Sequence, residues 1–266
     1  MRVPIFANDS AMAKGTLAEN FLDNPVWHAL HGPASRFLDR SFTSDTSHGP
    51  ASNSALDPIR FDPEVCIFGG AKYVDEAQWH RVAELVGIEG AFGFFRDAVP
   101  SPPPGWEELY RGSCLQMIAG DLPESSRPDV VELGPGDAKD MLELADLTQP
   151  GPFQLRTSEL GRYVGIRRKG RLIAMAGERF RVPGFVEISA VCTHPDVRGE
   201  GLAGELTLNV ARSIRSADDE AFLHVVDTNE NAVRLYGRIG FRVRRKVEVV
   251  FAQWHGPGWL PNDTDS

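Results

Sequence analysis

The sequence has little cysteine, no long apolar run and fewer basic than acidic residues. Its three cysteines, Cys66, Cys114 and Cys192, lie far apart and form no Cys-x-x-Cys pair, which argues against a disulfide framework or a zinc ribbon. No apolar run is long enough to span a membrane, and residues 1–16 carry charges in place of the apolar core of a signal peptide. We therefore expect a soluble protein of a reducing, cytoplasmic compartment that does not enter a membrane.

The 266 residues include 28 Lys and Arg against 37 Asp and Glu, which gives a net charge of −9. This charge argues against general nucleic-acid binding and against a polybasic membrane-surface protein. Hydrophobic residues make up 42% of the chain, as in ordinary globular proteins, and the length allows one large domain or two. His28 and His31 form an isolated H-x-x-H without a further ligand nearby, so we predict no metal site.

Segments rich in Gly, Pro, Ser and Asp divide the chain. Residues 41–57 indicate a surface loop, residues 101–105 a stiff linker, and residues 120–128 precede a clean run of regular elements. We predict a flexible N-terminus over 1–20, an α/β module over 21–125, a second module over 129–255 and a C-terminal tail over 256–266. Before Pro128, 10 basic and 17 acidic residues give a net charge of −7, whereas 18 basic and 20 acidic residues after it give −2.

The second module shows clear hydrophobic periodicity. The pattern predicts strands and helices in the order β, α, β, β, β, α, β, α, β over residues 130–133, 136–147, 163–167, 172–180, 185–192, 201–215, 221–226, 231–238 and 241–251. This order describes a mixed α/β (α+β) sheet with helices on both sides. In the strand over 185–192, alternation places Val186, Ile188, Ala190 and Cys192 on one face and Glu187, Ser189 and Val191 on the other.

Residues 199–204 spell G-x-G-x-x-G, the pattern of a dinucleotide-binding loop. In that fold the first glycine directly follows the strand, whereas here residues 193–198 intervene. The loop leads into an amphipathic helix, so its backbone N–H groups could hold an anion, with Arg198 adding positive charge. A glycine-rich turn without a ligand is the alternative.

Two motifs together resemble one family. Arg198 to Ala203 fits R/Q-x-x-G-x-G/A, and Asn229 to Phe241 fits N-x-x-A-x-x-L-Y-x-R-x-G-F, about 30 residues later. These are motifs of the GNAT superfamily of N-acetyltransferases. The segment from Glu187 to Pro195 resembles the branch that contains glycine N-acyltransferase-like proteins. The resemblance covers residues 129–253 and implies a splayed central sheet that binds coenzyme A.

The resemblance also implies a set of cofactor-binding residues. The glycine loop would hold the pyrophosphate, the end of the preceding strand would pair its backbone with the pantetheine arm, and two asparagines would reach the cofactor from the opposite side of the splayed sheet. The implied residues are Val191, Cys192, Thr193, Arg198, Gly199, Glu200, Gly201, Leu202, Ala203, Gly204, Asn229 and Asn231. An alternative for the asparagines is to cap the helix that begins near Ala232.

Acyl transfer to an amine requires a proton acceptor for the amine and a proton donor for the leaving thiolate. Tyr236 stands at the family's general-acid position, with a core tyrosine as the alternative. We predict Glu187 as the base, directly or through a water, with a salt-bridged Glu as the alternative. His224 is a second candidate base or a core histidine, and Cys192 is expected to be inert packing and not a nucleophile.

The first module lacks both motifs, although residues 77–86 predict a helix and residues 106–118 a strand. We expect a degenerate GNAT half that shapes the acceptor pocket, or else an unrelated helix-rich domain. The whole chain predicts an N-acetyltransferase that uses acetyl-CoA and no metal, as a monomer or homodimer, with a small-molecule, amino-acid or peptide amine as acceptor. The alternative is a coenzyme A-binding sensor without turnover. The acidic first module would favour a cationic acceptor.

Overall fold

The computed structural model describes residues 21–39, 57–124 and 129–260. The predicted flexible N-terminus over 1–20, most of the predicted surface loop and the predicted boundary at 125–128 lie outside the described residues. The same holds for residues 261–266 of the predicted tail. Among the described residues, no helix is long and apolar enough to cross a membrane.

An eight-stranded sheet runs through the molecule in the order β3-β10-β4-β9-β8-β7-β6-β5. Only the β8 and β9 pair is parallel, and the other neighbours are antiparallel. The strands are β3 (Ala91–Arg96), β4 (Trp106–Ala119), β5 (Val130–Leu133), β6 (Tyr163–Arg168), β7 (Arg171–Val182), β8 (Phe185–Thr193), β9 (Glu220–Val226) and β10 (Phe241–Trp254). The mixed α/β sheet predicted from periodicity is confirmed.

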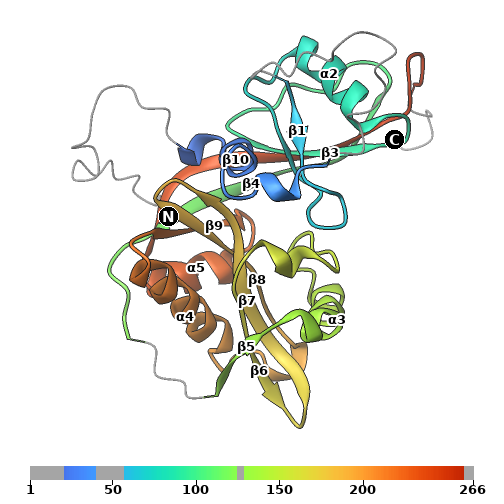
Figure 1. Cartoon of the computed structure of the whole chain (residues 1–266). Coiled ribbons are helices and arrows are strands. Elements are labelled where there is room, and N and C mark those ends of the chain that lie inside the picture. Colours follow the sequence, from blue (N-terminus) through green and yellow to red (C-terminus); the bar gives the residue numbers. More distant parts are fainter. Residues whose placement is uncertain (1–20, 40–56, 125–128, 261–266) are drawn as a thin grey trace.

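Helices cover both faces of this sheet, as Figure 1 shows. On one face, α4 (Leu202–Ser216) and α5 (Glu230–Arg238) pack on a cluster that includes Val186, Ile188 and Leu223. On the other face, α3 (Ala138–Thr148) packs on a cluster with Ala190 and Cys192. Each helix begins or ends within two residues of its predicted bounds, because apolar residues at every third or fourth position determine the buried side.

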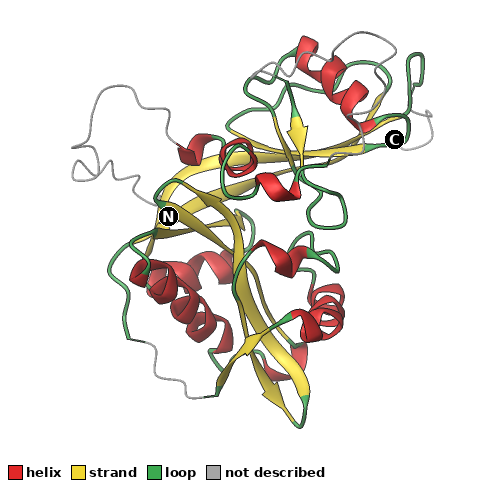
Figure 2. Cartoon of the chain, in the orientation of Figure 1, coloured by secondary structure: helices red, strands yellow, loops and turns green. Residues whose placement is uncertain are grey.

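The first half of the chain shares this sheet with the second. β4 lies between β10 and β9, and β3 pairs with the other edge of β10, so the yellow strands of Figure 2 continue from one end of the molecule to the other. The helix α2 (Glu76–Val86) covers β3 and β10 at that end. The short helix α1 (Pro25–Leu30) and the two-stranded sheet of β1 (Ile59–Arg60) and β2 (Gly69–Gly70) contribute to a cluster with residues of β7, β9 and β10.

A β-bulge in β8 corrects one expectation about its faces. Met175 of β7 pairs with Cys192 of β8, and Gly177 pairs with Ser189. Between these two pairs β8 therefore advances by three residues while β7 advances by two. Ala190 lies in this bulge, and its φ of 53° is in the left-handed region. The prediction that Ala190 and Cys192 share the face of Val186 and Ile188 is therefore wrong, since the bulge turns them toward α3.

Gly177 of β7 allows Tyr163 of β6 to lie across it. A Cβ added to Gly177 would stand 2.3 Å from the Tyr163 ring, far inside van der Waals contact. We expect Gly177→Ala to lower the free energy of unfolding by about 1–3 kcal/mol through overpacking. Urea unfolding monitored by circular dichroism would measure this change.

Gly237→Ala is the matched control for this substitution. Gly237 lies within α5, and an added Cβ would meet nothing within 4 Å. Replacing a helical glycine by alanine should raise the free energy of unfolding by about 0.5–1 kcal/mol. Equal stability of the two variants would contradict the close approach of Tyr163 to Gly177.

Candidate functional site

The parallel strands β8 and β9 separate before β8 ends. Their register runs from the Phe185 and Glu220 pair to the Ile188 and Leu223 pair, whereas β8 continues to Thr193. The backbone groups of residues 189–193 that point away from β7 therefore have no strand partner among the described residues. The Thr193 hydroxyl oxygen is also buried without a hydrogen-bond partner. An extended ligand with amide groups would satisfy such an edge.

The glycine loop lies directly beyond this free edge. A short 3-10 helix, Pro195–Val197, occupies the stretch that separates the strand from the glycines. Gly199 and Gly201 have φ values of 88° and 78°, which favour glycine, and a Cβ added to either would meet nothing within 4 Å. Gly201 is the N-cap of α4 and has no side chain to accept from its first-turn N–H groups. These groups stay available to a phosphate oxygen.

Charged residues of the loop have different surroundings. Arg168 donates to Glu200 at 2.9 Å, so Glu200 belongs to a surface ion pair with the turn between β6 and β7. Arg198 is exposed and forms no ion pair within the described part of the chain. Its guanidinium is therefore available to an anion held by the loop.

Asn229 and Asn231 lie at the start of α5. The Asn229 side chain accepts a hydrogen bond from the Ala232 N–H at 3.1 Å, which confirms the alternative prediction that an asparagine caps this helix. The Asn231 side chain accepts from Arg234 at 2.6 Å. Both asparagines are exposed, and a contact with a cofactor stays a prediction for each.

Tyr236 projects from α5 into the protein interior. It is 8% exposed and packs edge-on against the Phe241 ring, with centroids 6.1 Å apart. Burial raises its pKa, and the nearby Cys192 thiol raises the pKa further, so the phenol keeps its proton at neutral pH. Tyr236 belongs to the apolar cluster against which Val191 packs, so α5 brings Tyr236 toward the end of β8.

Glu187 lies on β8 just before the strands separate, and it is completely buried. Arg179 of β7 donates to it twice, at 2.8 and 2.7 Å, and His224 of β9 contacts it through Nδ1 at 2.7 Å. The alternative of a salt-bridged Glu is thus confirmed. The expectation that Glu187 lies on an open polar face is wrong, because residues of the first half of the chain cover this face.

Three phenylalanine rings surround the Arg179 guanidinium. Its central carbon lies 5.1, 5.5 and 4.5 Å from the ring centroids of Phe68, Phe95 and Phe180. Cation–π contacts and the carboxylate together compensate the loss of water around this buried charge. A burial effect would raise the pKa of Glu187, but Arg179 and the hydrogen bond from His224 outweigh it and lower the pKa to about 2.

This pKa makes Glu187 a weak proton acceptor at neutral pH. Its Oε1 accepts from Arg179 and contacts His224, while its Oε2 accepts one bond from Arg179. One lone pair of Oε2 therefore remains for a substrate proton. A direct role as base stays a prediction, and the geometry favours a role in which the ionised carboxylate orients its neighbours.

The hydrogen bonds around His224 determine its tautomer. The Gln116 amide nitrogen donates to the Leu22 carbonyl at 2.8 Å and lies 3.1 Å from His224 Nε2. The Gln116 oxygen accepts from Arg244 at 2.7 Å, which fixes the orientation of the amide. His224 Nε2 is then an acceptor and Nδ1 carries the proton toward Glu187, so His224 is neutral. The core-histidine alternative fits this arrangement, because Nε2 is already occupied.

The three cysteines are free and buried. Burial raises the pKa of Cys192 to about 11, so its thiol stays protonated and is a poor nucleophile. Among the described residues, no group of three His, Cys, Asp or Glu side chains is placed to hold a metal ion.

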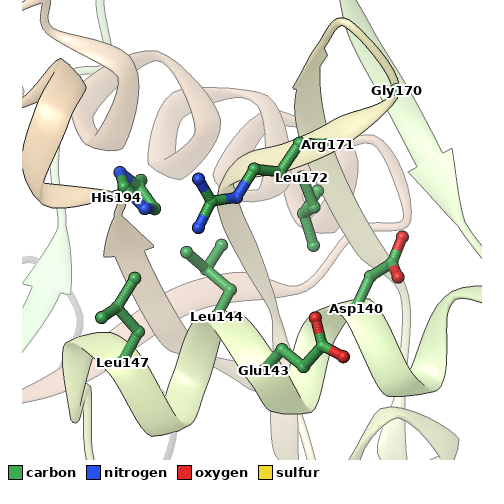
Figure 3. Close-up of a pocket in the computed structure, with 8 residues that line it drawn as sticks. All are labelled: Asp140, Glu143, Leu144, Leu147, Gly170, Arg171, Leu172 and His194. Atoms are coloured by element: carbon green, nitrogen blue, oxygen red, sulfur yellow. The ribbon is translucent and has the colours of Figure 1, made fainter.

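Sequence reasoning missed Arg179, the partner of Glu187. Its only signal is that two charged residues, Glu178 and Arg179, interrupt the apolar strand over 172–180. A shallow pocket of about 110 Å³ between α3 and the start of β7 was also missed. Figure 3 shows Arg171 reaching across this pocket toward His194, with Asp140 and Glu143 on the facing helix. None of the predicted cofactor residues lines it.

The depressed pKa of Glu187 predicts a dependence of stability on pH. A carboxylate with a folded pKa near 2 and an unfolded pKa of about 4.3 stabilises the fold above pH 4.3 by roughly 3 kcal/mol, and this contribution is lost as the pH falls toward 2. We expect Glu187→Gln to be less stable than the wild type at pH 7 and to lose less stability on acidification. Urea unfolding between pH 7 and pH 3 measures both effects.

The exposed ion pair of Glu230 and Arg234 provides the control. Its carboxylate side chain is 77% exposed, so Glu230→Gln should change the free energy of unfolding by less than about 1 kcal/mol at any pH. If Glu187→Gln and the wild type lose the same stability between pH 7 and pH 3, the ion pair does not hold the pKa of Glu187 down.

Comparison with known proteins identifies a family. The family model described as FR47-like protein matches residues 163–250, which contain β6 to β9, most of β10 and most of the site. A GNAT-family protein from Novosphingobium aromaticivorans DSM 12444 is 34% identical, with a TM-score of 0.77 over 89% of this chain and 99% of that chain. None of the curated proteins matches.

More distant structures share the fold alone. A GCN5-related N-acetyltransferase from Kribbella flavida is 18% identical, with a TM-score of 0.53 over 75% of this chain and 86% of that chain. A functionally unknown protein from Staphylococcus epidermidis ATCC 12228 is 11% identical, with a TM-score of 0.51 over 81% of this chain and 98% of that chain. The identity and coverage of the Novosphingobium protein decide the assignment: this chain belongs to the GNAT family of acetyltransferases.

Proposed function

We propose that this protein transfers an acetyl group from acetyl-CoA to the primary amine of a small molecule, an amino acid or a peptide. The observation that carries this proposal is the free edge of β8 over residues 189–193, which leads to the glycine loop and whose Val191 packs on the apolar cluster that contains Tyr236. This region brings together an open strand edge, a helix N-terminus without a side-chain cap and a buried phenol. We also propose that the protein belongs to the branch of the family that contains glycine N-acyltransferase-like proteins.

The residues present fit coenzyme A. The orphaned Thr193 hydroxyl lies on the free edge, and the left-handed Gly199 and Gly201 leave open space above the loop. The pantetheine amides would pair with the backbone of Val191, Cys192 and Thr193, and the pyrophosphate with the N–H groups from Gly199 to Gly204. Arg198 would add charge, and Asn229 and Asn231 would contact the cofactor from α5. The cofactor supplies an activated thioester carbonyl.

Proton transfer completes the reaction. The amine nitrogen attacks the carbonyl carbon, the N–C bond forms and the C–S bond breaks. Tyr236 would donate its proton to the departing thiolate, since its phenol is protonated at neutral pH. One ammonium proton would leave before the attack through Oε2 of Glu187, directly or by a water, and pass to solvent. The second proton, lost from the nitrogen after the attack, would restore the proton of Tyr236. Since the pKa of Glu187 is low, this carboxylate would pass the proton on at once and return to its ionised form.

The rival proposal is a coenzyme A-binding sensor without turnover. Mixing the purified protein with acetyl-CoA and a panel of alkylamines, arylalkylamines, amino acids and short peptides, and following the free thiol, separates the two. We expect at least one amine to raise thiol release above the rate with acetyl-CoA alone. Coenzyme A binding without release by any amine would refute the enzyme and support the sensor.

Tyr236→Phe tests the proposed general acid. Removing the proton donor should lower kcat by roughly 10²–10⁴-fold while the Kd of coenzyme A stays nearly the same. Thiol release and isothermal titration calorimetry measure the two quantities. Tyr73→Phe is the control, because Tyr73 is 54% exposed and lies outside the site. An unchanged kcat in Tyr236→Phe would remove this residue from the mechanism.

A further inference from the structure

We propose that Tyr163 is an acceptor-binding residue whose hydroxyl hydrogen-bonds the amine substrate, an inference that rests on the proposed function. Tyr163 is 1% exposed, and its hydroxyl has no hydrogen-bond partner. A buried phenol without a partner is costly, since the lost hydration is not replaced. A ligand that supplied the missing bond would remove this cost.

The position of the ring places this hydroxyl at the site. Tyr163 begins β6, and its ring lies over Gly177 of β7, whose own neighbour on β8 is Ser189. The phenol therefore extends across β7 toward the bulge of β8. Ala190 and Cys192 of this bulge belong to the same apolar cluster as Tyr163.

This face is opposite the one that carries the glycine loop helix. Cys192 and Tyr163 belong to the cluster under α3, whereas Leu202 and Leu206 of α4 belong to the cluster on the other face. A cofactor bound along the free edge of β8 would lie between the residues of one face and those of the other. Tyr163 thus lies on the same face of the sheet as Glu187, which residues of the first half of the chain cover, and we place the acceptor on this face.

A second pocket on the same face shares one wall residue, Phe153, with the packing around Tyr163, which does not itself line the pocket. It has a volume of about 380 Å³ and lies between the first half of the chain and the C-terminal end of α3. Phe153 forms part of its wall, and the Phe153 ring packs edge-on against the Tyr163 ring with centroids 5.9 Å apart. Ile67, from the segment before β2, forms part of the opposite wall.

The lining indicates the class of acceptor. Ile67, Phe153 and Pro152 present apolar surface, and Asp146 places a carboxylate at the rim. A primary amine on an apolar body fits both features, because the body packs on the apolar wall and the ammonium is attracted to the carboxylate. Once neutral, the amine nitrogen can donate to the Tyr163 oxygen while its lone pair attacks the thioester.

Tyr163→Phe removes the hydroxyl and keeps the ring. The expected result is a kcat/KM for the best amine of the panel that falls about tenfold, the loss of one hydrogen bond, with an unchanged KM for acetyl-CoA. The Tm of the free protein should not fall, because the hydroxyl bonds nothing there. Tyr110→Phe, at a tyrosine that is 45% exposed, is the control.

A structural role for the hydroxyl predicts a different pattern. In that case Tyr163→Phe lowers the Tm and reduces activity toward both substrates alike, which would overturn the proposal, as would an unchanged kcat/KM for the amine. Ile67→Trp provides an independent arm that fills the pocket and should raise the KM of the amine several-fold. Ile88→Trp, at a residue that is 63% exposed, should leave the KM unchanged.

A binding measurement separates this proposal from the proposed function. If no amine is acetylated, the same amines are added to the coenzyme A complex and the Tm is recorded. An amine that stabilises the wild-type complex but not the Tyr163→Phe complex supports the binding role while the enzyme is refuted. Absence of stabilisation by every amine, together with absence of transfer, overturns both proposals.

Discussion

β8 and β9 pair as parallel strands only as far as Ile188 and Leu223, and the rest of the proposed site depends on this separation. Each strand is held on its other side, β8 by β7 to Thr193 and β9 by β4 to Val226. The backbone beyond the last shared pair is therefore rigid but unpaired. A rigid edge with unsatisfied amide groups binds an extended ligand without first having to be ordered.

The opposite face of the sheet is closed by a charge pair that the first half of the chain completes. Arg179 and Glu187 are buried together, and Phe68 and Phe95 from the first half surround the guanidinium. The hydrogen bonds then continue through His224 and Gln116 to Leu22. The first half thus contributes to the electrostatics of β8, which supports the hypothesis that it shapes the acceptor side of a site built on residues 129–255.

Local patterns were sufficient for much of the fold. Hydrophobic periodicity located the elements of the second half, because each packs one face on a core. The glycine loop was predictable since left-handed residues before a helix favour glycine, and the Asn229 cap follows from the same kind of local chemistry. The family motifs supplied the candidate Tyr236, which periodicity alone would describe as a core residue.

Features that depend on long-range contacts were not predictable. The bulge at Ala190 breaks the two-residue alternation, and no local signal in the sequence marks it. The burial of Glu187 requires Arg179 on the neighbouring strand and aromatic rings from a distant segment. The orphaned hydroxyl of Tyr163 likewise depends on what surrounds it, so the sequence around it shows only a strand.

Amide hydrogen exchange with and without coenzyme A measures the protection of the free edge of β8 itself. We predict slower exchange over residues 189–193 and 199–204 when coenzyme A binds, and no change in α2, which lies at the far end of the sheet. Binding of coenzyme A without added protection of these two segments would contradict this prediction.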